Sequence, residues 1–550
     1  MNTTNTISKI IEASIERAKK CNEFPDFDSK KIIVEKPKNK SFGNWSTNIA
    51  LTLSKELKKN PLDIAEIIKS NINNSSIIDD VEIIPPGFIN FRLSNSFRSD
   101  LINQILREKE NYGSNKSGKN KKVQLEFVSV NPTGPVHVGH ARGAIVGSCL
   151  AKVLSYSGFD VHKEYYVNDA GNQIDLYISS IKSKIYENFN QLFPFPKDGY
   201  KGENIEIISE KIKKELQITE TNLVKIEDKE IRAAAIDLTL KIIKKDLIDL
   251  GIEYDNWFYE SSLFTNKTIE SIEKILDEQN LLYEQDGAKW FRSSNFFTDE
   301  DVVIHRSDDD GHTYFFSDMA YHYDKFKIRN FETVINIFGA DHHSHVNRLK
   351  SAISSFEIDV DKLRILLTQI VHFKNEEKVQ KFSKRSGNIY TVRDLISMVG
   401  KDVCRFNFLN RSLDSQQEFD LELATKESSE NPVYYVQYAY ARISSIIDSF
   451  DEKTDDVNLS ILENDFEKNL IDTLDFFPEV ILESTLKLQT HNITQYAIEL
   501  AKDFQVFYEN CRVISENKEL TQARIKLVLA CRIVLKNTLD IMGVNAPERM

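Results

Sequence analysis

The sequence is poor in several residue types that mark other classes of protein. It holds five cysteines in 550 residues and no CxxC pair, which argues against a disulfide framework and a thiolate zinc site. No stretch approaches the roughly 18 consecutive apolar residues that a membrane span needs. Residues 1–20 lack an apolar core and predict an amphipathic helix, not a targeting peptide. We therefore expect a cytoplasmic protein that does not bind a membrane.

Net positive charge is also lacking. The formal net charge of −13 is a poor match for a nucleic-acid binder. The charge is uneven, however, because residues 1–60 hold 12 Lys or Arg against 7 Asp or Glu, and residues 512–536 hold 6 against 2. Two basic ends on an acidic chain suit a polyanion that touches both ends, although solvated lysine-rich helix faces would give the same pattern.

The length predicts several domains, since 550 residues exceed what one hydrophobic core supports. The small, polar and basic segment Gly113–Lys122 predicts a flexible linker, and near Gly400 mixed patterns give way to long helical periodicity. We expect an N-terminal α+β module at 1–112, a catalytic domain at 123–400 with a helical insertion at about 180–280, and an all-α helical bundle at 401–550.

The middle of the chain alternates between strand and helix patterns, which predicts an α/β fold with a parallel sheet of Rossmann type. Ligands of such sheets bind at the carboxyl ends of the strands. The predicted strands are Val123–Val130, Val161–Val167, Thr333–Phe338 and Leu363–Phe373, and the predicted helices are Ala141–Tyr156 and His345–Phe356.

The segment 131–140 (NPTGPVHVGH) follows the first predicted strand and precedes a helix. The positive end of a helix that begins near His140 favours a phosphate, and His137 and His140 can donate hydrogen bonds to phosphoryl oxygens. Gly139 has no side chain to keep a nucleotide away from the backbone. The alternative is an ordinary turn with two surface histidines. We predict an ATP site formed by Pro132, Thr133, Gly134, His137, Gly139 and His140.

A second basic segment, 381–388 (KFSKRSGN), lies after the last predicted strand. Such runs are usually solvated surface, but a glycine-containing basic loop can also close over a triphosphate and stabilise the departing pyrophosphate. Together with the histidine turn it indicates adenylation of a carboxylic acid, with Lys381, Ser383 and Lys384 as catalytic candidates beside His137 and His140.

These two segments resemble the HIGH and KMSKS signatures of class I aminoacyl-tRNA synthetases, and the surrounding sequence resembles the bacterial arginyl-tRNA synthetases. Phe382 stands where the usual signature has Met, Ser148 where relatives commonly carry an acidic residue, and Ser344-His345 where they carry Gly-Tyr. The matching stretches are 42–51, 126–147, 164–175, 314–326, 338–343, 381–388, 431–443 and 543–550.

The resemblance implies an arginine–tRNA ligase that uses ATP, with Mg²⁺, to form arginyl-adenylate and then charges tRNA(Arg). A planar guanidinium favours carboxylates that pair with it side-on, and the family positions that contact arginine correspond to Glu126, Asn131, Tyr314, Asp318 and His342. We expect Glu126 on the first strand and Asp318 on a second strand or loop. No block of residues demands an editing domain.

The resemblance also implies that the N-terminal module contacts the tRNA elbow and the C-terminal bundle reads the anticodon. Tyr440 and Arg442 are the tRNA-binding candidates there, although tyrosines at helical spacing are more often core residues. We expect a monomer.

Three other interpretations remain open. The histidines of residues 341–345, with His305 and His312, could bind a metal, but His342 and His343 are neighbours that point apart, and we predict no metal site. Another class I synthetase or nucleotidyltransferase would carry the same two signatures. A non-catalytic RNA-binding paralogue would not need to keep His137, His140 and Lys384.

Overall fold

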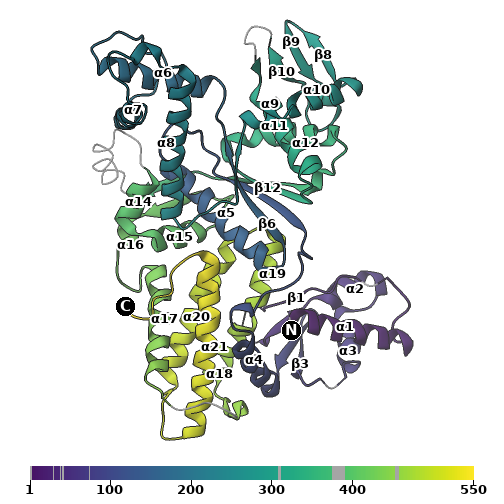
Figure 1. The fold of residues 1–550 in the computed structure, drawn as a ribbon. Coiled ribbons are helices and arrows are strands. Elements are labelled where there is room, and N and C mark those ends of the chain that lie inside the picture. The colour runs from purple at the N-terminus through teal and green to yellow at the C-terminus, as the bar shows by residue number, and fades with distance from the viewer. Residues whose placement is uncertain are drawn as a thin grey trace.

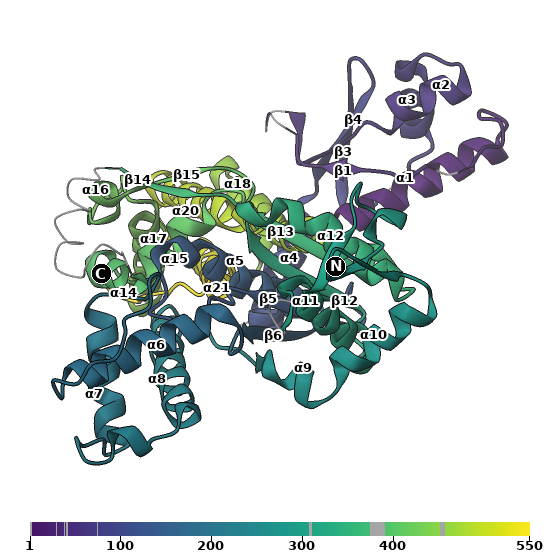
Figure 2. The ribbon, with the colours of Figure 1, turned by 90° about the horizontal axis from the view of Figure 1, so that it is seen from above.

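The computed structural model of the chain describes residues 3–28, 30–37, 39, 42–73, 75–306, 311–374, 391–451 and 457–550. A sheet lies at the centre, a bundle of long helices packs against one side of it, and residues 172–249 and 261–312 form two units on the other side (Figure 1). The N-terminal module and the unit of residues 172–249 lie at opposite ends of the molecule (Figure 2).

The central sheet has five parallel strands in the order β13-β12-β5-β6-β7. Its first strand in the chain, β5, thus lies in the middle, and the strand order reverses beside it, which is the arrangement of a doubly wound Rossmann sheet. This confirms the predicted fold class. The strands are β5 (Lys122–Phe127), β6 (Asp160–Val167), β7 (Asn256–Tyr259), β12 (Thr333–Gly339) and β13 (Leu363–Thr368).

Helix α5 (Val138–Tyr156) follows β5 and packs tightly on the sheet. A Cβ atom at Gly147 would lie 2.4 Å from Cγ of Phe127, so only glycine allows the helix to come this close to the strand. The contact fixes the start of α5 directly beyond the carboxyl end of β5.

The segment Gly113–Lys122, predicted as a flexible linker, is an ordered connection. Its backbone amides at Asn115, Gly118 and Asn120 donate to the carbonyls of the last residue of α5, its cap residue and the residue after the cap, over distances of 2.8–3.2 Å. The small, polar residues of this segment therefore form an ordered turn that supplies backbone donors to the end of the helix, where carbonyls need them.

The chain leaves the central sheet twice and not once. The predicted helical insertion at about 180–280 contains β7, which pairs in parallel with β6 and belongs to the sheet. One excursion therefore lies before β7 and holds α6 (Asn172–Glu187), α7 (Glu203–Glu215), a 3-10 turn (Leu223–Lys225) and α8 (Asp228–Asp249).

The second excursion lies after β7 and contains an antiparallel sheet of order β11-β10-β9-β8. It leads into α11, whose last turn widens to a π-helix at Asp324–Ile328. Its elements are α9 (Ser261–Thr265), α10 (Thr268–Glu278), β8 (Leu282–Gln285), β9 (Ala288–Phe291), a 3-10 turn (Ser293–Asn295), β10 (Val302–Arg306), β11 (Gly311–His312) and α11 (Tyr314–Tyr323).

Two sequence expectations were wrong at the end of this domain. Asp318 lies on helix α11 and not on a strand or loop. The predicted strand Leu363–Phe373 is two strands, since β13 stays in the central sheet while β14 pairs with β15. The remaining elements are two 3-10 turns (Ala340–His342 and Val360–Lys362), α12 (His343–Ser355), β14 (Val371–Lys374), α14 (Val392–Val399), α15 (Lys401–Leu409), β15 (Gln417–Asp420) and α16 (Leu421–Ala424).

The C-terminal part is the predicted helical bundle, although the predicted all-α range of 401–550 also includes the strand β15. Arg405 lies buried where it meets the catalytic domain and donates to the carbonyls of Met542 and Leu250 and to Oγ of Ser148. Ser148, which the sequence comparison marked as a departure from the family pattern, thus accepts one of the hydrogen bonds of Arg405. The elements are α17 (Pro432–Asp448), a 3-10 turn (Leu459–Ile461), α18 (Asp465–Asp475), α19 (Phe477–Lys487), α20 (His491–Asn510) and α21 (Lys518–Met542).

The N-terminal module has its own core around an antiparallel sheet of order β1-β2-β4-β3. Ile7, Ile11 and Ile15 of its first helix are buried, which confirms the amphipathic helix. None of the described helices is long and apolar enough to span a membrane. The elements are α1 (Thr3–Lys20), β1 (Val34–Glu35), β2 (Trp45–Thr47), α2 (Ile49–Leu57), α3 (Pro61–Ser70), β3 (Ile78–Ile84), β4 (Phe88–Leu93), α4 (Asn95–Glu108) and a 3-10 turn (Lys109–Asn111).

Buried polar contacts join this module to the bundle. Arg98 pairs with Asp472 at 2.8 Å. The carboxylate of Asp475, 5% exposed, accepts from the hydroxyl of Thr3 and from the indole of Trp45. Burial, with the charge of Asp472, raises the pKa of Asp475 to about 7. Docking of the module therefore favours a protonated Asp475.

We expect Asp475→Asn to remove a pH dependence of stability. The folded pKa lies above the unfolded value, so the stabilising contribution is complete below about pH 4 and is lost as the pH rises through about 7. Between pH 5.5 and 8, the free energy of unfolding should fall by about 2 kcal/mol less in the variant than in the parent chain. Urea unfolding at both pH values measures this. The exposed Asp465→Asn is the control, and full retention of the pH dependence in D475N would contradict the expectation.

Candidate active site

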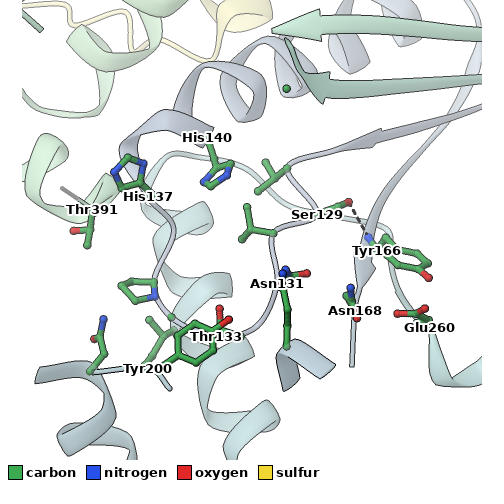
Figure 3. A pocket seen from close by; sticks show the side chains of 18 of the residues that line it. Ser129, Asn131, Thr133, His137, His140, Tyr166, Asn168, Tyr200, Glu260 and Thr391 are labelled. Carbon is green, nitrogen blue, oxygen red and sulfur yellow. Dashed lines mark hydrogen bonds between the residues drawn. The ribbon is translucent and has the colours of Figure 1, made fainter. Parts of the chain in front are cut away.

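A cavity of about 1410 Å³ opens at the carboxyl ends of β5 and β12, where the strand order reverses. In Figure 3, His137 and Thr391 lie on one side of it and Tyr166 and Glu260 on the other, with Asn131 between them. Residues of α7, α8 and α11 complete its walls. The position is the one that a Rossmann sheet uses for ligands.

The turn that carries the two histidines is held from both sides. The amide of Val136 donates to Oδ2 of Asp246 on α8 at 3.3 Å, and its carbonyl accepts from the amide of Val392 at 2.9 Å. An isolated antiparallel bridge joins His137 to Thr391. The excursion before β7 and the start of α14 therefore fix the turn at the cavity.

His137 caps α5, which begins at Val138. Its Nδ1 accepts a hydrogen bond from the amide of Gly139 at 3.0 Å. Burial lowers the pKa of both His137 and His140 below the ordinary value. Since Nδ1 accepts, a neutral His137 ring carries its proton on Nε2, which can donate. A Cβ atom at residue 139 would lie 3.0 Å from this Nδ1, so glycine also leaves room for the cap.

Glu126 is the last residue but one of β5 and is 5% exposed. Its Oε2 lies 2.6 Å from Nζ of Lys325, a fully buried lysine, and its Oε1 accepts from the hydroxyl of Ser129 at 3.0 Å. The charge of this carboxylate is thus already balanced within the protein.

Two other carboxylates, Glu260 and Asp318, lack a basic partner of this kind. Burial, with the neighbouring charges of Asp318 and Asp169, raises the pKa of Glu260 to about 7. Asp318 accepts from Nε2 of His345 at 2.7 Å. Among the described residues no lysine or arginine contacts either carboxylate. The cavity therefore has one acidic side that suits a cation.

Most of the predicted site residues line this cavity. Pro132 is buried behind the turn, and Gly139 is exposed but does not line the cavity. Lys381, Ser383 and Lys384 lie outside the described residues; Thr391, the first described residue after them, pairs with His137. The predicted lining residues are Glu126, Asn131, Thr133, Gly134, His137, His140, Tyr314, Asp318 and His342.

The sequence reasoning missed three residues of the site. Glu260 follows β7, inside the range assigned to an insertion, although the end of the strand-like 256–259 was a usable signal. His345, which was not among the predicted site residues, contacts Asp318. No sequence pattern around Lys325 indicated that it belongs to the site. In the described part of the chain, no group of three or more His, Cys, Asp or Glu is placed to hold a metal ion.

The two predicted tRNA contacts differ in exposure. Tyr440 is 5% exposed and belongs to the core of the bundle, which agrees with the alternative interpretation of a core tyrosine. Arg442 lies on the surface between the rings of Tyr438 and Tyr508, at 4.9 and 4.8 Å. The rings of Tyr434 and Tyr438 stack at 6.4 Å and 8°.

Comparison with known proteins places all three parts of the chain in one family. Family models match an "Arginyl tRNA synthetase N terminal domain" at residues 5–93, a "tRNA synthetases class I (R), catalytic domain" at 101–412 and a "DALR anticodon binding domain" at 436–550.

Full-length relatives agree with these models. An arginine–tRNA ligase of Acetivibrio thermocellus is 40% identical over 557 residues, covering 99% of this chain and 98% of that protein. One of Caldanaerobacter subterraneus is 42% identical, covering 99% and 98%. The crystal structure of arginyl-tRNA synthetase from Plasmodium falciparum shares the fold at a TM-score of 0.78 and 23% identity, covering 100% of this chain and 99% of that one. With its histidine turn, parallel sheet and helical bundle, the chain belongs to the arginyl-tRNA synthetases of class I.

Proposed function

We propose that this arginine–tRNA ligase activates L-arginine with ATP in the described cavity, with each substrate on its own side. The observation that carries the proposal is the separation of charge across the cavity. Glu260 and Asp318 supply carboxylates that no described lysine or arginine contacts on one side, while His137, His140 and the start of α5 supply hydrogen-bond donors on the other.

The arginine side chain would lie against Glu260 and Asp318. A guanidinium presents a planar fork of donors that pairs side-on with carboxylates. Glu126 is already balanced by Lys325, so we assign it, with Asn131, to the α-amino group. Tyr314 is one helical turn before Asp318, 51% exposed, and would close the pocket, with His342 at its rim.

ATP would bind along the histidine turn. The Nε2–H of His137 and the ring of His140 would donate to phosphoryl oxygens, and the positive end of α5 favours the phosphates. Thr133 and Gly134 line the same wall, where a Cβ atom at Gly134 would lie 3.9 Å from Nδ2 of Asn204. Lys381, Ser383 and Lys384 would clamp the β- and γ-phosphates; the pairing of Thr391 with His137 supports this.

In the first step, a carboxylate oxygen of arginine would attack the α-phosphorus of ATP. The bond from that phosphorus to the bridging oxygen breaks, and pyrophosphate leaves with the electron pair. In the second step, the 2′-hydroxyl of the terminal adenosine of tRNA, by class I analogy, would attack the carbonyl carbon and release AMP. The protein contributes positioning and charge stabilisation in both steps.

The remaining partners are also proposals. Mg²⁺ is usually held by substrate phosphates with one or two carboxylates. Asp341 lines the cavity near enough to His140 for its charge to act on that ring, so it would hold the ion together with ATP. The ion would neutralise phosphate charge. Cysteines 21, 149, 404, 511 and 531 are free thiols, which supports a reducing cytoplasm. We also propose a monomer.

ATP–pyrophosphate exchange with each of the standard amino acids, with and without total tRNA, tests the proposed function. We expect exchange with arginine only, because a substrate with a neutral side chain would leave the carboxylates on the acidic side of the cavity unpaired. Preferred exchange with any other amino acid would contradict the arginine assignment.

We expect Glu260→Gln to raise the KM for arginine about 10- to 100-fold at pH 8, with the KM for ATP unchanged. The pKa of Glu260 is raised to about 7, and the guanidinium binds its ionised form, so in the parent enzyme the KM for arginine should rise as the pH falls below 7. The variant should lose this dependence. Exchange kinetics from pH 6 to 8.5 measure it. Glu253→Gln, exposed on the loop before β7, is the control.

The surface stack of Tyr438, Arg442 and Tyr508 would bind unpaired bases of tRNA. Planar side chains stack on bases, and a guanidinium adds charge, at about 1–3 kcal/mol per base. We expect Arg442→Ala to weaken tRNA binding about tenfold or more, and Arg442→Lys, which keeps the charge, to weaken it as well. Titration with labelled tRNA measures both. A lysine variant with parent affinity would mean that charge alone matters.

A further inference from the structure

A fully buried lysine lies below the floor of the cavity. Nζ of Lys325 is 2.6 Å from Oε2 of Glu126 and 4.0 Å from the centroid of the Tyr321 ring. Lys325 is on the π-helical turn that follows α11, and such turns occur frequently at functional sites. A lysine is rarely buried completely unless it is paired.

A directed chain of hydrogen bonds starts at this lysine. Nζ of Lys325 also donates to Oδ1 of Asn336 at 3.2 Å, which leaves the amide of Asn336 to donate to Nε2 of His322 at 2.8 Å. A ring whose Nε2 accepts carries its proton on Nδ1, and Nδ1 of His322 lies 2.8 Å from the backbone carbonyl of Asp318. Burial, with the charge of Lys325, keeps the pKa of His322 well below its ordinary value, so this ring is neutral.

The chain therefore joins two elements that carry substrate carboxylates. It begins at Glu126 on β5 and ends at Asp318 on α11, and both side chains line the cavity. Every link lies in the buried interior between them, since Lys325, Asn336 and His322 are at most 1% exposed. A buried network in which each donor has its acceptor is rigid and allows few alternative arrangements.

The position of Glu126 beside another carboxylate is a further reason why this buried side chain needs a cation. It lies directly beside Glu164 of β6 in the register of the sheet, and two like charges side by side destabilise each other. Glu164 has its own partners in Arg329 and Tyr321. Lys325 is the cation in contact with Glu126, and it leaves Oε1 turned toward Ser129 at the cavity.

We propose that Lys325 is a positioning residue for arginine: it balances and orients the carboxylate of Glu126 directly, and through Asn336 and His322 it is linked to the backbone of α11 at Asp318. The proposal rests on the proposed function of this cavity, since it takes Glu126 and Asp318 as contacts of the substrate. Lys325 itself touches no substrate.

The test compares Lys325→Met with Lys327→Met in ATP–pyrophosphate exchange. Lys327 is on the same π-helical turn but exposed, so it is a matched control. We expect K325M to raise the KM for arginine about 10- to 100-fold, with the KM for ATP within about twofold of the parent value. K327M should keep both. In the double variant K325M/E126Q, the effects should not add, because Lys325 acts through Glu126.

A pH series separates positioning from lost packing. In K325M the buried Glu126 would lie beside the anionic Glu164 with no cation in contact with it, and two such charges favour uptake of a proton as the pH falls. The ratio of the arginine KM of K325M to that of the parent should then grow as the pH falls from 8.5 to 6.5, whereas lost packing gives a constant ratio. The ionisable groups that face Glu126 are Lys325, Tyr321, Glu164, Tyr166 and Tyr254.

The outcomes distinguish this proposal from the proposed function. If E126Q raises the KM for arginine while K325M leaves it unchanged, or changes it by a pH-independent ratio, the role of Lys325 is overturned and the pocket stands. If E126Q alone leaves the KM for arginine unchanged, Glu126 is no substrate contact and the proposed pocket fails there. Should K325M not fold, Lys325→Gln, which keeps a donor without the charge, is judged by the same ratio.

Discussion

The close contact between α5 and β5 is the constraint on which the site depends. Gly147 allows the helix to lie against Phe127 with no room for a side chain between them. The start of α5 is thereby held just beyond the carboxyl end of the central strand, where the order of the parallel sheet reverses. A helix placed there aims its free amides and its positive end into the cavity. His137 caps that helix, so the same contact orients the imidazole.

Around this fixed point the cavity is built from parts far apart in the chain. Asp246 of α8 and Val392 of α14 hold the turn from either side. Glu260 lies directly after β7 and Asp318 lies on α11, and together they form an acidic side opposite the histidines. One side of the cavity thus favours a cation and the other side favours an anion. This arrangement suits a cationic amino acid and a polyphosphate that must meet between the two sides.

The sequence predicted the structure correctly where consecutive residues form a strand, a turn and a helix by themselves. The histidine turn, its glycine and the following helix are consecutive residues, so their roles followed from strand, turn and helix signals. Local signals of this kind and the family resemblance together predicted nine of the residues that line the cavity. Asp318 was expected on a strand or loop because its apolar neighbours fit both periodicities. Tyr440 was a tRNA-binding candidate beside the alternative of a core residue because aromatic spacing does not tell which face a bundle covers.

The sequence by itself determined the fold class, the two signature segments and, through its resemblance, the family. These follow from neighbouring residues, whose periodicity and spacing survive without knowledge of the rest of the chain. Only the tertiary structure decided that Glu260 joins Asp318, that His345 contacts that carboxylate, and that Lys325 balances Glu126. Lys325 and Glu126 are 199 residues apart, and their pairing depends on burial and distance, which arise only when the sheet and the helices pack together.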